Sequence, residues 1–292
     1  MQQTRDPHAD RSDDGPAHGH AADRYGVVGQ PVAHSRSPQI HAMFAAATGQ
    51  HLVYDRHEVA PADFEHMVRA FFEGGGRGLN VTVPHKERAA RFADELTPRA
   101  RAAGAVNTLA RLADGRILGD NTDGAGLVAD LARLGFEVSG KSVLILGAGG
   151  ATRGILGPLR ERKPARLVVA NRNGAIAREL AGQMGCDYRE LATQIDTDGA
   201  LPGGFDLVIH ATSLGLEGKV PEVTPRIIGP RTLAYDLGYG KPDTPFTRWA
   251  LGHGAAAAAQ GIGMLVEQAA ESFALWRGLR ADTDPVHRAL AG

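Results

Sequence analysis

The sequence has one cysteine and no long hydrophobic segment among its 292 residues. Cys186 has no partner with which to form a disulfide inside the chain, which is typical of proteins from a reducing compartment. No apolar run approaches the roughly 20 residues that a helix needs to cross a bilayer, and the alanine run at 255–259 is far too short. We therefore expect a cytoplasmic protein without a membrane partner.

The sequence also lacks an excess of charge of either sign. It contains 32 Lys and Arg against 33 Asp and Glu, a formal net charge of −1. A nucleic-acid-binding protein would usually show a basic excess or stripe, so no nucleic-acid partner is expected. The length and the 43% hydrophobic content are sufficient for two domains with real cores.

The first 23 residues lack apolar periodicity and are rich in Asp, His, Gly and Pro. This composition predicts a disordered tail. It has no apolar central segment of the kind that a signal peptide requires. Its histidines offer adventitious chelation only, and no metal site is predicted anywhere in the chain.

From residue 24 onward, strand-like apolar runs alternate with helical patterns, which predicts an α/β fold with mainly parallel sheets. A first unit spans 24–122. A second unit, 123–258, contains the wholly apolar strand at 143–146, and residues 259–292 form a C-terminal helical segment.

The sequence "GAGGATRG" follows that apolar strand and opens a helix. Gly147 permits a tight turn, Gly149 allows close approach of a pyrophosphate, and the helix N-terminus attracts phosphate. The third position of the usual fingerprint is Thr152 instead of glycine. A second strand ends at Ala170, where the ribose of a dinucleotide should lie, so we predict a dinucleotide site.

The residues after that second strand indicate which dinucleotide binds. They are Asn171, Arg172 and Asn173, without the carboxylate that usually accepts the ribose hydroxyls of NAD. A guanidinium can pair with a 2′-phosphate through two hydrogen bonds. NADP is therefore the predicted cofactor.

The first unit contains polar residues at the ends of its predicted elements. In "AHSRSPQIH", Ser37 reads as the N-cap of a helix whose first residue is Pro38, and this leaves Ser35 unexplained. In "NVTVPHK", Asn80 and Thr82 lie on one side of a strand, and Lys86 follows at its C-terminal end.

These motifs, together with "GAVNT", "GDNTDG", "ATSLG", "YDLGYG" and "GIGMLVEQA", occur in the order and approximate spacing of the shikimate dehydrogenase family. The resemblance covers residues 25 to about 290. It implies a substrate domain at 24–122, a Rossmann-type NADP domain at 123–258, and C-terminal helices that return to the substrate domain. It also implies reversible, NADPH-dependent reduction of 3-dehydroshikimate to shikimate, in the pathway to chorismate and the aromatic amino acids.

The resemblance also implies roles for individual residues. Lys86 and Asp123 form the catalytic pair. The substrate-binding positions also include these two and are otherwise Ser35, Ser37, Asn80, Thr82, Asn107, Tyr239 and Gln268. The cofactor-binding positions are Gly147, Ala148, Gly149, Gly150, Ala151, Asn171, Arg172, Asn173, Thr212, Ser213, Leu237 and Gly261.

In this mechanism a cationic Lys86 donates a proton to the oxygen on which negative charge develops during hydride transfer. Whether Lys86 acts alone or shares the proton with Asp123 stays open at this point. The paired serines favour shikimate; a quinate or aminoshikimate dehydrogenase is the alternative, and a catalytically silent ligand sensor is a third. A monomer or a homodimer is expected.

The chain departs from the usual family pattern around the cofactor. Asn173 and Ile176 stand where many NADP-dependent members have threonine and a second arginine, and Arg178 is a possible substitute for that arginine. His210 replaces an asparagine common before "ATS", and Gln260 replaces an acidic residue or asparagine.

Overall fold

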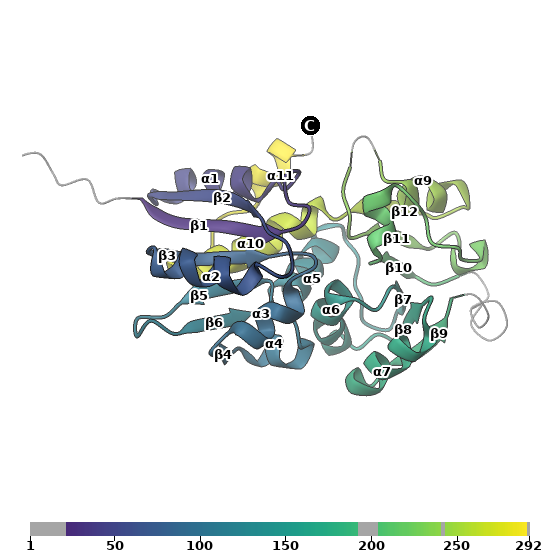
Figure 1. Cartoon of the computed structure of the whole chain (residues 1–292). Coiled ribbons are helices and arrows are strands. Elements are labelled where there is room, and N and C mark those ends of the chain that lie inside the picture. The colour runs from purple at the N-terminus through teal and green to yellow at the C-terminus, as the bar shows by residue number, and fades with distance from the viewer. Residues whose placement is uncertain (1–21, 192–203, 241–242, 291–292) are drawn as a thin grey trace, which may run out of the picture.

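The computed structural model describes residues 22–191, 204–240 and 243–290. The predicted disordered tail lies outside the described residues up to residue 21, and its last residue, Asp23, already belongs to the first strand. The chain forms two lobes, each built around a six-stranded sheet (Figure 1). The predicted α/β fold is confirmed.

Sheet A forms the first lobe and has the strand order β2-β1-β3-β5-β6-β4. Its strands are β1 (Asp23–Gly29), β2 (Leu52–Glu58), β3 (Gly76–Val81), β4 (Glu95–Leu96), β5 (Thr108–Arg111) and β6 (Ile117–Asp120). The β1, β2 and β3 strands are parallel, whereas β5 runs antiparallel to both β3 and β6. This hairpin was not predicted, because its two strands are four residues long and lack a strong apolar alternation.

Sheet B forms the second lobe and is parallel throughout. Its strands are β7 (Ser142–Leu146), β8 (Arg166–Asn171), β9 (Asp187–Glu190), β10 (Leu207–His210), β11 (Leu233–Asp236) and β12 (Ala257–Gln260). The order β9-β8-β7-β10-β11-β12 is the 3-2-1-4-5-6 order of dinucleotide-binding folds. The predicted boundary between residues 258 and 259 falls within β12, whose alanines carry little strand signal.

Helices cover both sheets and connect the lobes. They are α1 (Ser37–Thr48), α2 (Phe64–Glu73), α3 (Lys86–Phe92), α4 (Pro98–Ala103), α5 (Asp123–Arg133), α6 (Gly150–Glu161), α7 (Gly174–Met184), α9 (Pro245–Gly252), α10 (Ile262–Arg277) and α11 (Asp284–Leu290). Two short 3-10 helices, η1 (Ser213–Glu217) and η2 (Pro225–Ile227), follow β10.

Helix α10 lies in the first lobe, although it follows the last strand of the second lobe (Figure 1). Its residues Val266, Ala270 and Phe273 share one core with Ile40 and Phe44 of α1. Helix α5 packs closely along α10. At Gly126 there is no room for a side chain, since a Cβ there would approach the Cβ of Gln268 to 2.7 Å. The chain passes from the first lobe to the second at α5 and returns at α10, so the packing of these two helices holds the two connections side by side.

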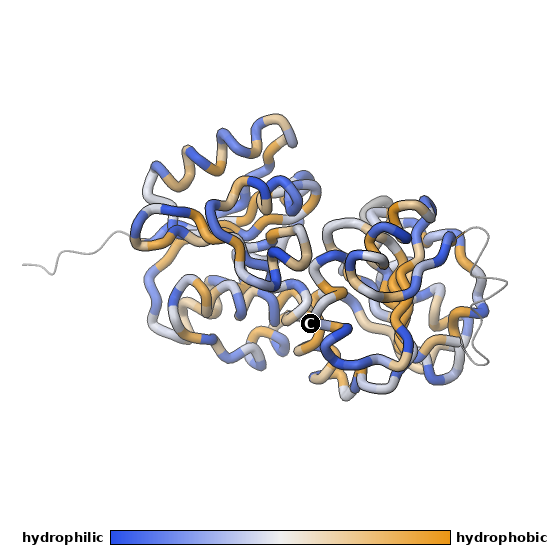
Figure 2. Tube along the Cα trace, turned by 90° about the horizontal axis from the view of Figure 1, so that it is seen from below, coloured by the Kyte–Doolittle hydropathy of each residue, from blue (hydrophilic) through white to orange (hydrophobic). Residues whose placement is uncertain are grey.

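Each sheet has its own hydrophobic core. In the second lobe, apolar residues on the two faces of sheet B form separate clusters, one against α5 and α6 and one against α9. Figure 2 shows hydrophobic stretches along the strands in the middle of this lobe. Within the described part of the chain, no helix is long and apolar enough to cross a membrane.

Candidate active site

A cleft of about 1970 Å³ is lined by residues of both lobes. It lies at the carboxyl ends of β7 and β10, where the order of sheet B reverses, which is where open α/β sheets bind ligands. It is lined by every predicted substrate position and by all the predicted cofactor positions except Asn173. Residues that the sequence places up to 233 positions apart, from Ser35 to Gln268, thus share one cleft.

Lys86 and Asp123 form a close ion pair in this cleft. Lys86 Nζ lies 2.5 Å from Asp123 Oδ2, and the two side chains are 12% and 6% exposed. Each residue begins a helix, Lys86 the α3 helix and Asp123 the α5 helix. Asp123 therefore stands in the first turn of α5, where the helix dipole favours a negative charge.

Asn107 orients the carboxylate of this pair. Its Nδ2 donates to Asp123 Oδ1 over 2.9 Å and lies 3.2 Å from Gln268 Oε1. Its Oδ1 accepts the backbone N–H of Thr122 over 2.8 Å. Both oxygens of Asp123 therefore accept hydrogen bonds, one from Lys86 and one from Asn107, and the position of the pair is fixed before any ligand binds.

The two serines of the first motif lie together, but their capping roles differ from the prediction. Helix α1 begins at Ser37, its N-cap is Arg36, and no side-chain cap comes from Ser37. Instead, the backbone N–H of Ser37 donates to Ser35 Oγ over 3.3 Å, and the two hydroxyls lie 3.2 Å apart. Ser35, the residue that capping left unexplained, thus satisfies a free N–H of the first turn.

Arg56 was not predicted, although it fixes this serine loop. Its Nε and Nη2 donate to the backbone carbonyl of Ser35 over 3.0 and 2.7 Å. An arginine on strand β2 carries no local signal for such a role, because the contact joins residues 21 positions apart.

Asn80 projects into the same region from strand β3. Its Oδ1 accepts a hydrogen bond from the Tyr54 hydroxyl over 2.7 Å, and its Nδ2 donates to Ser272 Oγ over 2.9 Å. Burial raises the pKa of Tyr54, which keeps the phenol protonated as a donor. Tyr54 and Ser272 were not predicted, and neither stands in a recognisable motif. Thr82 follows the end of β3 and lines the cleft beside Asn80.

The glycine turn of the second lobe faces the Lys86 pair. Gly147 has φ +114°, and a Cβ there would approach the Ala211 carbonyl oxygen to 2.9 Å, so the position requires glycine. Gly149 is the N-cap of α6, no side chain caps this helix, and a Cβ at Gly149 would meet open space. Thr152, in place of the third glycine, is buried and donates to the Gly147 carbonyl over 2.9 Å. Free N–H groups at such a terminus fit a phosphate.

The end of β8 fits a cofactor in part. Asn171 and Arg172 line the cleft, and Arg172 is exposed. Asn173 does not line it, because its Oδ1 accepts the Ala175 N–H over 3.0 Å and caps α7. Arg178 is bound elsewhere: its Nε donates to the Tyr188 hydroxyl over 2.8 Å, and its guanidinium lies over that ring. Among these residues, Arg172 is the cation that faces the cleft.

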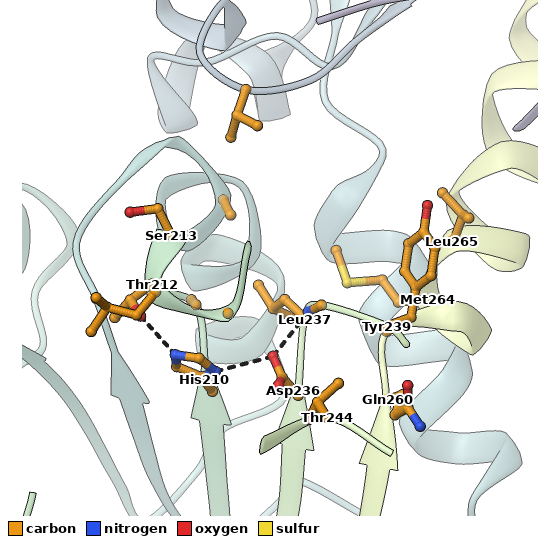
Figure 3. Close-up of a pocket in the computed structure, with 18 of the residues that line it drawn as sticks. His210, Thr212, Ser213, Asp236, Leu237, Tyr239, Thr244, Gln260, Met264 and Leu265 are labelled. Carbon is orange, nitrogen blue, oxygen red and sulfur yellow. Dashed lines mark hydrogen bonds and ion pairs between the residues drawn. The ribbon is translucent and has the colours of Figure 1, made fainter. Parts of the chain in front are cut away.

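The remaining predicted residues lie around the ends of β10, β11 and β12. Figure 3 shows Thr212, Ser213, Leu237 and Tyr239 on the loops that follow these strands. Gly261 begins the last crossing into α10, and its N–H donates to the Gly238 carbonyl over 2.9 Å. No group of three or more His, Cys, Asp or Glu in the described ranges is arranged to hold a metal ion.

The sequence is similar to known proteins along most of its length. The family model described as "Shikimate dehydrogenase substrate binding domain" matches residues 27–109. "Shikimate / quinate 5-dehydrogenase" matches 130–215, and "Shikimate 5'-dehydrogenase C-terminal domain" matches 261–291. The chain is 49% identical over 276 residues to shikimate dehydrogenase (NADP(+)) of Saccharophagus degradans, covering 92% of this chain and 98% of that protein.

The chain belongs to the shikimate dehydrogenase family. Its identity to shikimate dehydrogenase (NADP(+)) of Methylococcus capsulatus is 52% over 272 residues, with 90% of this chain and 94% of that protein covered. The structure of shikimate 5-dehydrogenase from Thermus thermophilus in complex with NADP(H) and shikimate has a TM-score of 0.81 and 32% identity, covering 91% and 98% of the two chains.

Membership of the shikimate dehydrogenase family agrees with the position of the predicted residues along the chain. Six of them, from Ser35 to Asn107, lie within the part that matches the substrate-binding model. The glycine turn lies within the second matched segment, and Gln268 lies within the third. Asp123 lies between the first and second matches, and its contact with Lys86 joins it to the site.

Proposed function

We propose that this chain catalyses the reversible, NADPH-dependent reduction of 3-dehydroshikimate to shikimate. One observation supports this more than any other: the Lys86–Asp123 pair lies directly against the glycine turn. A Cβ at Gly150 would stand 3.5 Å from Lys86 Cβ, so the proton donor of the first lobe adjoins the phosphate-binding turn of the second. A reduction needs a proton donor and a bound hydride donor in one cleft.

Two features of the described residues fit NADP. Gly149 and Gly150 present the uncapped N-terminus of α6 to a pyrophosphate, and Arg172 presents a guanidinium to a 2′-phosphate. When bound, NADPH supplies the hydride to the substrate carbonyl carbon. The remaining chemistry belongs to the protein's own side chains.

Lys86 acts at the substrate oxygen. During reduction, negative charge develops on this oxygen, and the ammonium group stabilises it and donates a proton. Asp123 and Asn107 hold Lys86 in place through the contacts already described. In the direction of oxidation the amine takes the hydroxyl proton back, and Asp123 stabilises the resulting ammonium. The low exposure of the pair keeps bulk water from competing for this proton.

Ser35 and Ser37 bind the substrate carboxylate in this proposal. Their hydroxyls are adjacent and buried, and they stand at the N-terminus of α1, where the helix dipole favours an anion. Asn80, Thr82, Asn107, Tyr239 and Gln268 surround the ring and its hydroxyls. The expected monomer or homodimer and the cytoplasmic location stay predictions.

The proposed function is tested by incubating the purified protein with shikimate, quinate or aminoshikimate, each with NADP or NAD, and following nicotinamide absorbance. Turnover should be fastest with shikimate and NADP. Absence of turnover with shikimate and either cofactor would overturn the proposal, and faster turnover with quinate or aminoshikimate would reassign the substrate.

Removing either serine hydroxyl should weaken substrate binding. Ser35→Ala and Ser37→Ala are each expected to raise the KM for shikimate roughly tenfold, because each removes a hydrogen bond to a charged group. The KM for NADP should remain within about twofold, since the serines lie in the other lobe. Ser142→Ala is the matched control: it removes a serine hydroxyl that is bonded to Asp206 outside the cleft. Equal changes in both KM values would contradict the assignment.

Removing the Arg172 guanidinium should reduce the preference for NADP. Arg172→Gln is expected to raise the KM for NADP by about tenfold and to leave the KM for NAD nearly unchanged, because NAD lacks the 2′-phosphate. Arg178→Gln is the control, since its guanidinium is already bound to Tyr188. If Arg178→Gln, and not Arg172→Gln, raised the KM for NADP, the assignment would pass to Arg178.

A further inference from the structure

A buried imidazole joins the loops that follow two neighbouring strands of sheet B. His210 ends β10, Asp236 ends β11, and the two side chains are 0% and 2% exposed. His210 Nδ1 lies 3.1 Å from Asp236 Oδ1, and His210 Nε2 lies 2.6 Å from Thr212 Oγ1 (Figure 3). The ring also packs on Phe246, with 4.9 Å between ring centroids. Both ring nitrogens are therefore engaged, and the side chain has a single orientation.

Asp236 is held as a carboxylate in this cluster. Burial alone would raise its pKa, but the hydrogen bond and charge interaction with His210 and the hydrogen bond from the Gly238 N–H outweigh burial and lower it. A carboxylate oxygen only accepts hydrogen bonds, so the proton between the two side chains resides on His210 Nδ1. Asp236 Oδ1 also accepts the Gly238 N–H over 3.0 Å, which fixes the loop after β11.

Thr212 transmits this arrangement to the glycine turn. It lies two residues after the end of β10 and lines the cleft, and a Cβ at Gly147 would approach its Cγ2 to 3.2 Å. One chain of contacts thus runs from Asp236 through His210 and Thr212 to the first glycine of the turn. The loop after β11 belongs to the same unit, because the Leu237 N–H donates to the His210 carbonyl over 2.9 Å.

We propose that His210 is a positioning residue for the cofactor side of the cleft, acting through Thr212 and Asp236. This inference rests on the proposed function to the extent that the ligand is NADP. His210 lines the same cleft as Ser35 and Lys86. Its two polar partners are Thr212, on the loop after β10, and Asp236, at the end of β11. Its removal should therefore weaken NADP binding more than shikimate binding.

The test measures the Kd of NADP by calorimetry, without turnover, and the KM of both substrates by absorbance. His210→Leu removes both hydrogen bonds and should raise the Kd and KM of NADP about tenfold, while the KM of shikimate stays within twofold. His210→Gln retains a donor and an acceptor at its end and should stay within about threefold of the wild type. A wild-type protein that binds NADP but does not oxidise shikimate would overturn the proposed function and leave this inference standing.

A double-mutant cycle tests whether His210 acts through Thr212. Thr212→Val keeps a methyl group toward Gly147 and removes the hydroxyl, so it alone should weaken NADP binding. The double variant Thr212→Val/His210→Leu should bind NADP no more weakly than the weaker-binding of the two single variants, because each substitution removes the same hydrogen bond. If the fold-increases in the Kd of NADP from the two single variants multiply in the double variant, His210 does not act through Thr212.

Thr232→Val provides the matched structural control. Its buried hydroxyl donates to the Phe205 carbonyl over 2.6 Å, just before the amino end of β11, away from the cleft. It should lower the Tm without changing the Kd of NADP. The inference is overturned if His210→Leu behaves in the same way, or if Thr212→Val binds NADP as the wild type does. Wild-type binding of NADP by Thr212→Val overturns the inference even if His210→Leu does not fold.

Discussion

Replacing Lys86 by alanine is expected to lower kcat for shikimate oxidation by about 10³-fold, because a positioned acid or base contributes roughly 10² to 10⁴ to such a step. The Kd of shikimate should change far less, since the serine pair and Asn80 remain. Water is a poor substitute for the missing amine, because the side chain that it would replace is only 12% exposed. Calorimetry with shikimate and steady-state assays with NADP separate the two effects.

Lys86→Arg distinguishes proton transfer from charge. Arginine keeps a cation beside Asp123 but does not release its proton in proteins. Its planar guanidinium is also larger than the ammonium group that lies 2.5 Å from Asp123 Oδ2. Its kcat should therefore be nearly as low as that of the alanine variant. Lys141→Ala, which lies outside the cleft, should retain the wild-type rate. Full turnover by Lys86→Ala would reject the role of Lys86 in acid–base chemistry.

The sequence predicts the second lobe better than the first for a physical reason. Strands β7, β8 and β10 are buried on both faces, so their apolar runs are continuous, and the glycine turn marks the first crossing. In the first lobe, the β5–β6 hairpin consists of short strands whose pairing depends on contacts with β3. Local patterns carry little information about such pairing.

The candidate site shows the same division. Lys86 and Asp123 stand in motifs, and the resemblance to a family was sufficient to predict their pairing. Tyr54, Arg56 and Ser272 were missed because their roles depend on contacts across the fold; Ser272, for example, accepts from Asn80 over a separation of 192 residues. His210 did carry a signal, since it departs from the residue that is common at its position. The departure from the family pattern thus marked this position, whereas the buried cluster around it is known only from the structure.

The stability of the first lobe should decrease in mild acid because of His41. This residue of α1 is fully buried and stacked on Tyr54, with 4.4 Å between ring centroids. Burial lowers its pKa from 6.5 to about 3. Below pH 6.5 the unfolded chain binds a proton at His41 that the folded chain does not, so stability falls as the pH falls from 6.5 toward 3. At pH 5 this linkage amounts to about 2 kcal/mol, or roughly a 30-fold change in the unfolding equilibrium.

Urea unfolding of the wild type and of His41→Leu at pH 7.5 and pH 5 measures this contribution. The free energy of unfolding of the wild type should fall by about 2 kcal/mol more than that of the variant, because all other titrating groups are common to both and cancel in the difference. Trp276, whose ring centroid lies 5.4 Å from that of His41, provides a fluorescence signal from the same lobe. His66→Leu, which removes an exposed histidine of α2, should reproduce the wild-type decrease. Equal decreases in the wild type and His41→Leu would show that the folded chain accommodates a proton on His41, and the burial argument would then be wrong.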